Sequence, residues 1–136
     1  LVGALVETGV IKMLAVEAIK LTNGNLNATA MLILWMSAFA SAFIDNIPFV
    51  ATLIPLIKDM GQLGLTNLDP MWWSLALGAC LGGNGTLIGA SANVVVASMA
   101  AQRGKQISFL GFMKIAFPVM VLTVAISSVY VYIRYL

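Results

Sequence analysis

The chain has 136 residues, of which 61% are hydrophobic and 9% are charged, and its formal net charge is +2. Soluble domains carry about 25% charged residues, so this composition excludes an ordinary soluble domain. The seven basic residues are scattered, which excludes a nucleic-acid partner, and the chain has no His. Uncharged stretches cover residues 21–44, 70–102 and 115–133, each near or above the roughly 20 residues that cross a hydrocarbon core. We therefore expect an all-α integral membrane protein of the cell (inner or plasma) membrane, with the lipid bilayer as its partner, and not an enzyme.

The first expected elements precede a polar segment at residues 22–27. Residues 1–7 are mostly apolar and are expected to end a transmembrane helix. Residues 8–20 carry charges at helical spacing with apolar residues between them, which predicts an amphipathic helix lying at the membrane interface. An ordinary helix end with snorkelling lysines is the alternative. Because the sequence begins within an apolar run, we expect it to be part of a longer transporter.

Residues 27–60 are predicted to form a re-entrant helical hairpin whose tip is residues 45–48. Asn25 or Asn27 is expected to cap the first arm. Pro48 should bias Ile47 away from helical geometry and begin a short second arm over residues 49–59. About a dozen helical residues extend about 18 Å, which is less than the roughly 30 Å of a hydrocarbon core. A single Pro-kinked helix over residues 28–57 is the alternative.

Residues 70–103 are predicted to form a discontinuous transmembrane helix in which residues 82–92 are unwound. Trp72 and Trp73 at its start are typical of interfacial anchors, and the glycines that follow interrupt it. Residues 108–135 are predicted to form the last transmembrane helix. An interfacial belt is expected at its end, formed by Tyr130, Tyr132, Arg134 and Tyr135. A basic cluster predicts that the loop before this helix is cytoplasmic, and it comprises Arg103, Lys105 and Lys114.

The hairpin tip carries the first set of candidate ion-binding residues. Asp45 lies far from either predicted interface, where a carboxylate costs roughly 2.5–3.5 kcal/mol. Such a residue is retained if it binds a cation, exchanges a proton, or forms a structural ion pair or helix cap. Asn46 and Thr52 add neutral oxygen atoms that suit a hard cation such as Na⁺. The residues expected to contact an ion or substrate here are Asp45, Asn46, Ile47, Pro48 and Thr52.

The glycine-rich stretch is the second candidate segment. Unwound backbone exposes carbonyl oxygens to cations and amides to anions, and Ser91 and Asn93 are expected to cap the helix that follows. The expected binding residues are Gly82, Gly83, Asn84, Gly85, Thr86, Gly89, Ser91 and Asn93, with a Na⁺ site at Asp45, Asn46 and Asn84. No cofactor is expected beyond the transported or coupling ions, Na⁺ or H⁺. The structural alternative is helix packing, because two glycine pairs have the spacing of packing motifs, Gly78 with Gly82 and Gly85 with Gly89.

The segments from Phe43 to Thr52 and from Gly78 to Asn93 resemble the arsenite permease/NhaD-type antiporter family. That family belongs to the ion transporter superfamily, with the citrate and dicarboxylate symporters, and the second segment looks most like its melanosomal P-protein branch. The resemblance covers essentially the whole chain. It implies the second, C-terminal inverted repeat of a longer homodimeric transporter whose N-terminal half is missing here. Asp45 stands where the symporters have a hydroxyl residue, which favours ion or proton exchange.

The residues and the resemblance together predict the C-terminal half of a secondary active transporter. A Na⁺/H⁺ antiporter and an ion-coupled, arsenite-type anion permease are the two leading interpretations. A sodium-coupled citrate or dicarboxylate symporter and a passive ion channel or conductance regulator are the alternatives. Uphill flux driven by an ion gradient would separate the transporters from the channel.

Overall fold

The computed structural model describes residue 4 and residues 7–136, and these residues form helices and turns without a strand among them. The elements are α2 (Val10–Leu21), α3 (Leu26–Ser41), α4 (Asn46–Gln62), α5 (Asp69–Gly82), α6 (Ser91–Gln102) and α7 (Phe109–Tyr135). The predicted all-α class is confirmed for the described residues. The expected end of a transmembrane helix over residues 1–7 lies mostly outside them.

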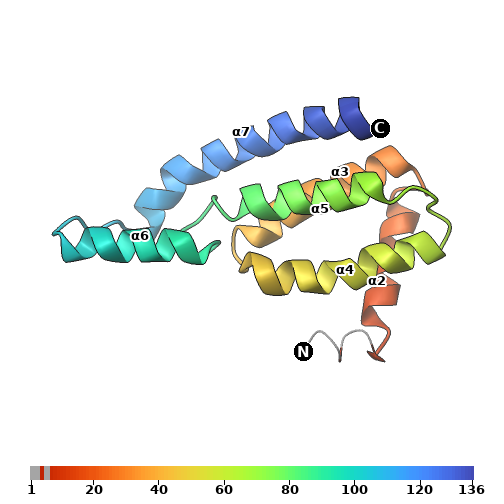
Figure 1. Ribbon diagram of the computed structural model, residues 1–136, viewed down its shortest axis with the longest axis horizontal. Coiled ribbons are helices and arrows are strands. Elements are labelled where there is room, and N and C mark those ends of the chain that lie inside the picture. The colour runs from red at the N-terminus through yellow and green to blue at the C-terminus, as the bar shows by residue number, and fades with distance from the viewer. Residues whose placement is uncertain (1–3, 5–6) are drawn as a thin grey trace.

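The helices form a bundle with one projecting element. α3 packs most extensively against α5, α4 contacts both of them, and α7 packs along α5 and α3. α2 packs against α4. α6 projects from one end of the bundle, where α7 begins, and none of its 12 residues is buried (Figure 1). The ends of α3 and α5 and the starts of α4 and α6 therefore gather toward that same end.

The turn between α2 and α3 follows from its polar residues. Asn23 and Gly24 have φ angles of 52° and 69°, which Asn and Gly tolerate better than other residues. Asn25, the first of the two expected candidates, is the N-cap of α3, and its side chain accepts a hydrogen bond of 3.0 Å from the backbone N–H of Asn27. The polar segment thus turns the chain and begins α3.

The second arm of the hairpin is longer than the sequence predicts. α4 begins at Asn46 and has 17 residues, so Ile47 lies inside the helix and its expected displacement from helical geometry is wrong. The physical reason is that Pro48 occupies the first turn, where a missing N–H removes no intrahelical hydrogen bond. Seventeen residues extend about 25 Å, so α4 approaches the thickness of a hydrocarbon core. The re-entrant insertion of this hairpin stays a prediction.

The contact between α3 and α5 is close enough to bring backbone against backbone. A Cβ atom placed at Gly82 would lie 2.6 Å from the Cα of Ala38 and closer still to its carbonyl oxygen. A Cβ atom at Gly78 would lie 2.9 Å from the Cβ of Ser37 and would also collide with the carbonyl oxygen of Leu34. The packing interpretation of this glycine pair is therefore correct, and only glycine permits this separation of the helices.

Two apolar clusters flank the contact between α3 and α5. The first joins α3, α4 and α5 and comprises Ala30, Ile33, Leu53, Leu56, Ile57, Met60, Met71 and Leu75. The second joins α3 and α7 and comprises Leu34, Ala38, Ala42, Met120 and Val124. Full burial of one such large side chain contributes about 1.5–3 kcal/mol. The bundle is thus held on both sides of the glycine contact.

α7 is the one helix of the described residues that is long and apolar enough to cross a membrane alone, and α3 is a shorter apolar helix. The indole ring of Trp73 at the start of α5 stacks on the ring of Tyr135 at the end of α7, with centroids 5.7 Å apart. Tyr130 meets Tyr135 edge to face at 6.2 Å. Trp73, Tyr130 and Tyr135 therefore meet where α5 begins and α7 ends.

We predict that Gly82→Ala destabilises the bundle by about 1–3 kcal/mol, because the added Cβ forces α3 and α5 apart. The measurement is the free energy of unfolding of the full transporter in detergent micelles. Gly61→Ala is the matched control, because the Cβ atom added to this glycine of α4 would meet only the flexible side chain of Leu68 and no backbone atom. Equal effects of the two changes would contradict the close helix contact.

Candidate functional site

The two candidate segments meet because α3 and α5 run parallel. Gly78 faces Leu34 and Gly82 faces Ala38, so both helices advance in the same direction and end together. From here on, the hairpin tip denotes residues 41–48, which extend the predicted tip of residues 45–48 toward α3. The glycine loop denotes residues 83–90, which connect α5 to α6. The hairpin tip and the glycine loop lie side by side at this end of the bundle (Figure 1).

Thr86 fastens the glycine loop to the hairpin tip. Its side chain is fully buried, and its hydroxyl donates a hydrogen bond to the carbonyl oxygen of Ala42. The same oxygen atom of Thr86 accepts a hydrogen bond of 3.2 Å from the backbone N–H of Gly89. One hydroxyl thus satisfies a buried carbonyl of the tip and a buried amide of the loop.

Gly89 lies inside a ring of carbonyl oxygens. A Cβ atom placed on it would lie 2.7 Å from the carbonyl oxygen of Gly83, 2.8 Å from that of Ala42 and 3.0 Å from that of Ser41. The first two contacts are too short for a Cβ atom and the third is tight, so the close approach of backbone requires glycine here. Oxygen atoms from both segments therefore converge within a small volume.

Asn46 joins the ring from the start of α4. Its amide group faces Gly83, where an added Cβ atom would lie 3.0 Å from Oδ1 of Asn46. Its Oδ1 is also hydrogen-bonded to Ser41, whose hydroxyl lies 2.7 Å from the carbonyl oxygen of Ala79. A hydroxyl has one proton, so Ser41 can donate to Ala79 only when Asn46 turns its NH₂ group toward it. The orientation of the Asn46 amide is thus linked to the end of α5.

Asn93 holds the glycine loop from the other side. Its Nδ2 atom donates hydrogen bonds of 3.0 Å to the carbonyl oxygens of both Gly83 and Thr86. The predicted capping of α6 by Ser91 and Asn93 is wrong. The helix begins at Ser91, its N-cap is Ala90, and no side chain caps its first amides. The reason is that Ser91 is already the first helical residue, and Asn93 uses its side chain on the loop.

Other predicted residues are more open. Asp45 is the N-cap of α4 without a side-chain capping bond, and its side chain is exposed. Among the described residues the one ion pair joins Glu17 to Lys20, so Asp45 has no ionic partner there. Further residues exposed around the tip and loop are Ile47, Pro48, Asn84 and Ser91. A carboxylate without a countercharge among the described residues therefore lies in the hairpin tip, directly before Asn46.

Three predicted residues have mainly structural surroundings. Gly82 packs against Ala38, and a Cβ atom at Gly85 would lie 3.0 Å from Cε of Met120 on α7. The hydroxyl of Thr52 donates a 2.9 Å hydrogen bond to the carbonyl oxygen of Pro48, one turn earlier in α4. Its side chain lines a groove between α2, α3 and α4 and does not belong to the tip.

Sequence reasoning missed two contributors, Ser41 and Ala42. Ser41 supplies a hydroxyl to Asn46, and both residues supply carbonyl oxygens around Gly89. A signal existed, because the helix that leads to Asp45 ends with a run of small residues that permits such close approach.

The donor atoms of the hairpin tip and the glycine loop suit a hard cation better than a transition metal. The described residues contain no group of three or more His, Cys, Asp or Glu side chains that could hold a metal ion. The tip and loop present backbone carbonyl oxygens, amide oxygens and one carboxylate, which are the ligands that alkali and alkaline-earth cations prefer. The expected Na⁺ site at Asp45, Asn46 and Asn84 stays a prediction.

Comparison with known proteins gives one family and several long relatives. The family model described as citrate transporter matches residues 1–78. An uncharacterized transporter of Mycobacterium tuberculosis (strain H37Rv) is 48% identical over 137 residues, which cover 99% of this chain and 32% of that protein. The 46 kDa membrane protein of Mycobacterium leprae is 42% identical over 138 residues, which cover 100% of this chain and 32% of that protein. The P protein of Homo sapiens is 47% identical over 111 residues, which cover 79% of this chain and 13% of that protein. The chain thus spans about a third of the length of the mycobacterial relatives, at 32%. No solved structure matches.

We predict that Thr86→Val destabilises the protein by about 1–3 kcal/mol, because the isosteric change leaves the buried carbonyl of Ala42 without its partner. The amide of Gly89 also loses one acceptor and keeps the 3.3 Å hydrogen bond to the backbone carbonyl of Thr86. The measurement is the thermal unfolding of the full transporter in detergent. Thr123→Val is the matched control, since the Thr123 hydroxyl bonds to Met120 within its own helix. A melting temperature unchanged by Thr86→Val would show that this hydroxyl does not fasten the loop.

Proposed function

Because the chain belongs to the citrate transporter family, we propose that it forms the ion-binding part of a secondary active membrane transporter. One observation carries the proposal: the hairpin tip and the glycine loop gather carbonyl and amide oxygens from two distant segments beside the free carboxylate of Asp45. Irregular backbone in a membrane is tolerated where it lines a cavity or is buried in protein. Such backbone at the ends of broken helices is typical of transporter sites.

We propose that Asp45 exchanges a proton for a cation. The carboxylate binds Na⁺ together with oxygen atoms of Asn46 and Asn84, and protonation of the same group releases the cation. The two events exclude one another at one side chain, which is the minimal requirement for antiport. Support comes from the exposure of Asp45 and from the lack of an ionic partner for it among the described residues.

A second candidate is ion-coupled transport of an anion such as citrate or arsenite. The description of the matching family favours a carboxylate substrate. The starts of α4 and α6 also favour it, because neither helix has a side-chain capping bond for its first amides. The positive end of a helix dipole and free N–H groups attract anions. In this candidate the cation at Asp45 drives the uptake of the anion.

The remaining features of the proposal concern the whole transporter. Residues 27–60 form a re-entrant hairpin and residues 70–103 a broken transmembrane helix, as the second inverted repeat of the fold. A first repeat from the rest of the transporter completes the site, and two copies form a homodimer in the cell membrane. Family membership and the apolar helix α7 support the membrane location.

We predict that Asp45→Asn lowers ion-coupled flux by at least about tenfold, equivalent to about 1.4 kcal/mol, while the protein still folds and inserts. Asparagine keeps the shape of the side chain but cannot titrate, so any remaining flux should not respond to pH. The measurement is flux through the full-length transporter in proteoliposomes across a pH series.

Asp59→Asn serves as the matched control, because Asp59 lies near the opposite end of α4 and should be dispensable. Coupled flux with the wild-type pH profile in Asp45→Asn would exclude Asp45 as the exchanging group.

A further inference from the structure

A separate groove lies between α2, α3 and α4, away from the hairpin tip. Its volume is about 450 Å³, within the range of about 300–1,000 Å³ that is usual for ligand pockets. Apart from Glu17 and Thr52 its lining is apolar: Ala18, Leu21, Leu32, Ile33, Met36, Ala40, Phe49, Leu53, Leu56 and Met60. Because these residues come from three helices, the groove is a feature of their packing.

Among the described residues that line the groove, no side chain offers a free hydrogen-bond donor to its interior. The hydroxyl of Thr52 is engaged by the carbonyl oxygen of Pro48, so Thr52 adds no free donor to the groove. Glu17 is exposed and lies at the rim. A water molecule needs two to four polar partners, and a polar ligand would lose its own without replacement. The chemistry of the lining therefore selects a flexible hydrocarbon chain.

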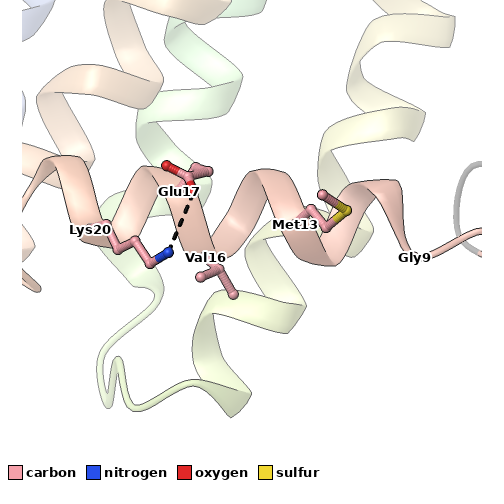
Figure 2. Close-up of a pocket in the computed structure, with 5 residues that line it drawn as sticks. All are labelled: Gly9, Met13, Val16, Glu17 and Lys20. Carbon is pink, nitrogen blue, oxygen red and sulfur yellow. Dashed lines mark hydrogen bonds and ion pairs between the residues drawn. The ribbon is translucent and has the colours of Figure 1, made fainter.

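The rim of the groove carries a pair of opposite charges. Glu17 also lines a second hollow of about 380 Å³ on α2, together with Gly9, Met13, Val16 and Lys20 (Figure 2). Nζ of Lys20 lies 3.4 Å from Oε1 of Glu17, and both side chains are exposed. The apolar groove and the charged hollow are thus joined at Glu17.

We propose that this groove binds one acyl chain of a zwitterionic phospholipid such as phosphatidylethanolamine. The head group lies over the hollow on α2, with its phosphate near Lys20 and its ammonium near Glu17. This complementarity distinguishes the ligand, because an anionic head group would face the carboxylate of Glu17 and a diacylglycerol would offer no charge to either member of the Glu17–Lys20 ion pair. The lipid fills the space that α2 and α4 leave open and ties the amphipathic helix α2 to the hairpin.

The test uses the full-length transporter in phosphatidylcholine nanodiscs with a trace of phosphatidylethanolamine that carries a diazirine at the end of one acyl chain. After illumination, mass spectrometry of peptides is expected to locate the probe on groove residues of α3 and α4. Ala40→Phe fills the groove and should lower this labelling about tenfold, equivalent to about 1.4 kcal/mol. Met36→Trp should also lower the labelling. Because Met36 is exposed at the edge of the groove, this change adds no volume to the buried core.

Ala51→Phe is the matched control, because Ala51 is exposed on α4 outside the groove and its change should leave labelling unaltered. Glu17→Lys should shift the preference from phosphatidylethanolamine to an otherwise identical phosphatidylglycerol probe. Undiminished labelling in both groove-filling variants would overturn the proposal. So would wild-type labelling that misses the groove, which would mean that another segment of the transporter covers it. Equal labelling by a diacylglycerol probe would overturn the assignment of the head group.

Discussion

The backbone contact between α3 and α5 is the constraint on which the rest of the structure depends. Gly78 and Gly82 let the two helices lie so close that any side chain on either glycine would strike the opposite backbone. A hydrophobic effect cannot drive helices together in lipid, so close packing of small residues has to supply the association. Since the helices run parallel, the same contact fixes where each of them ends. The hairpin tip and the glycine loop consequently meet, although the hydrogen-bonded residues Ala42 and Thr86 are 44 positions apart.

The residues where the hairpin tip meets the glycine loop fall into two groups: some hold the backbone in place, and others are proposed to bind the ion. Thr86, Gly89 and Asn93 use their polar groups or their lack of a side chain to hold the backbone in place. Asp45 and Asn84 stay exposed and have no such engagement among the described contacts. A fixed backbone with a free carboxylate is suited to repeated binding and release, because the ligand need not reorganise the scaffold each time. The groove proposed to bind a phospholipid contains none of these residues and lies between α2, α3 and α4.

Local sequence signals predicted the all-α class, the candidate N-cap at Asn25 and the packing role of the first glycine pair. They could not predict which polar side chains would be engaged in hydrogen bonds between segments that are far apart in the sequence. The hydroxyl of Thr86, a predicted binding residue, is buried against Ala42. Ser91 was expected to cap α6 but is the first residue of that helix. The start of α4 was placed too late because proline disfavours helix before itself in general, whereas the first turn is an exception. Ser41 escaped notice because its partners lie five and 38 positions away.

The central claim is that the hairpin tip and the glycine loop form one binding site. The most direct measurement is the rate at which a membrane-impermeant maleimide labels Ile44→Cys on the tip and Ile88→Cys on the loop, two exposed positions that are not proposed to bind the ion. Both variants are made in the full transporter without Cys80, and the concentration of Na⁺ or citrate is varied. Our account predicts that the same solute slows labelling of both cysteines with the same half-maximal concentration, while a control Ile107→Cys in the loop before α7 is unaffected. Protection of the two positions by different solutes, or at different concentrations, would contradict a shared site.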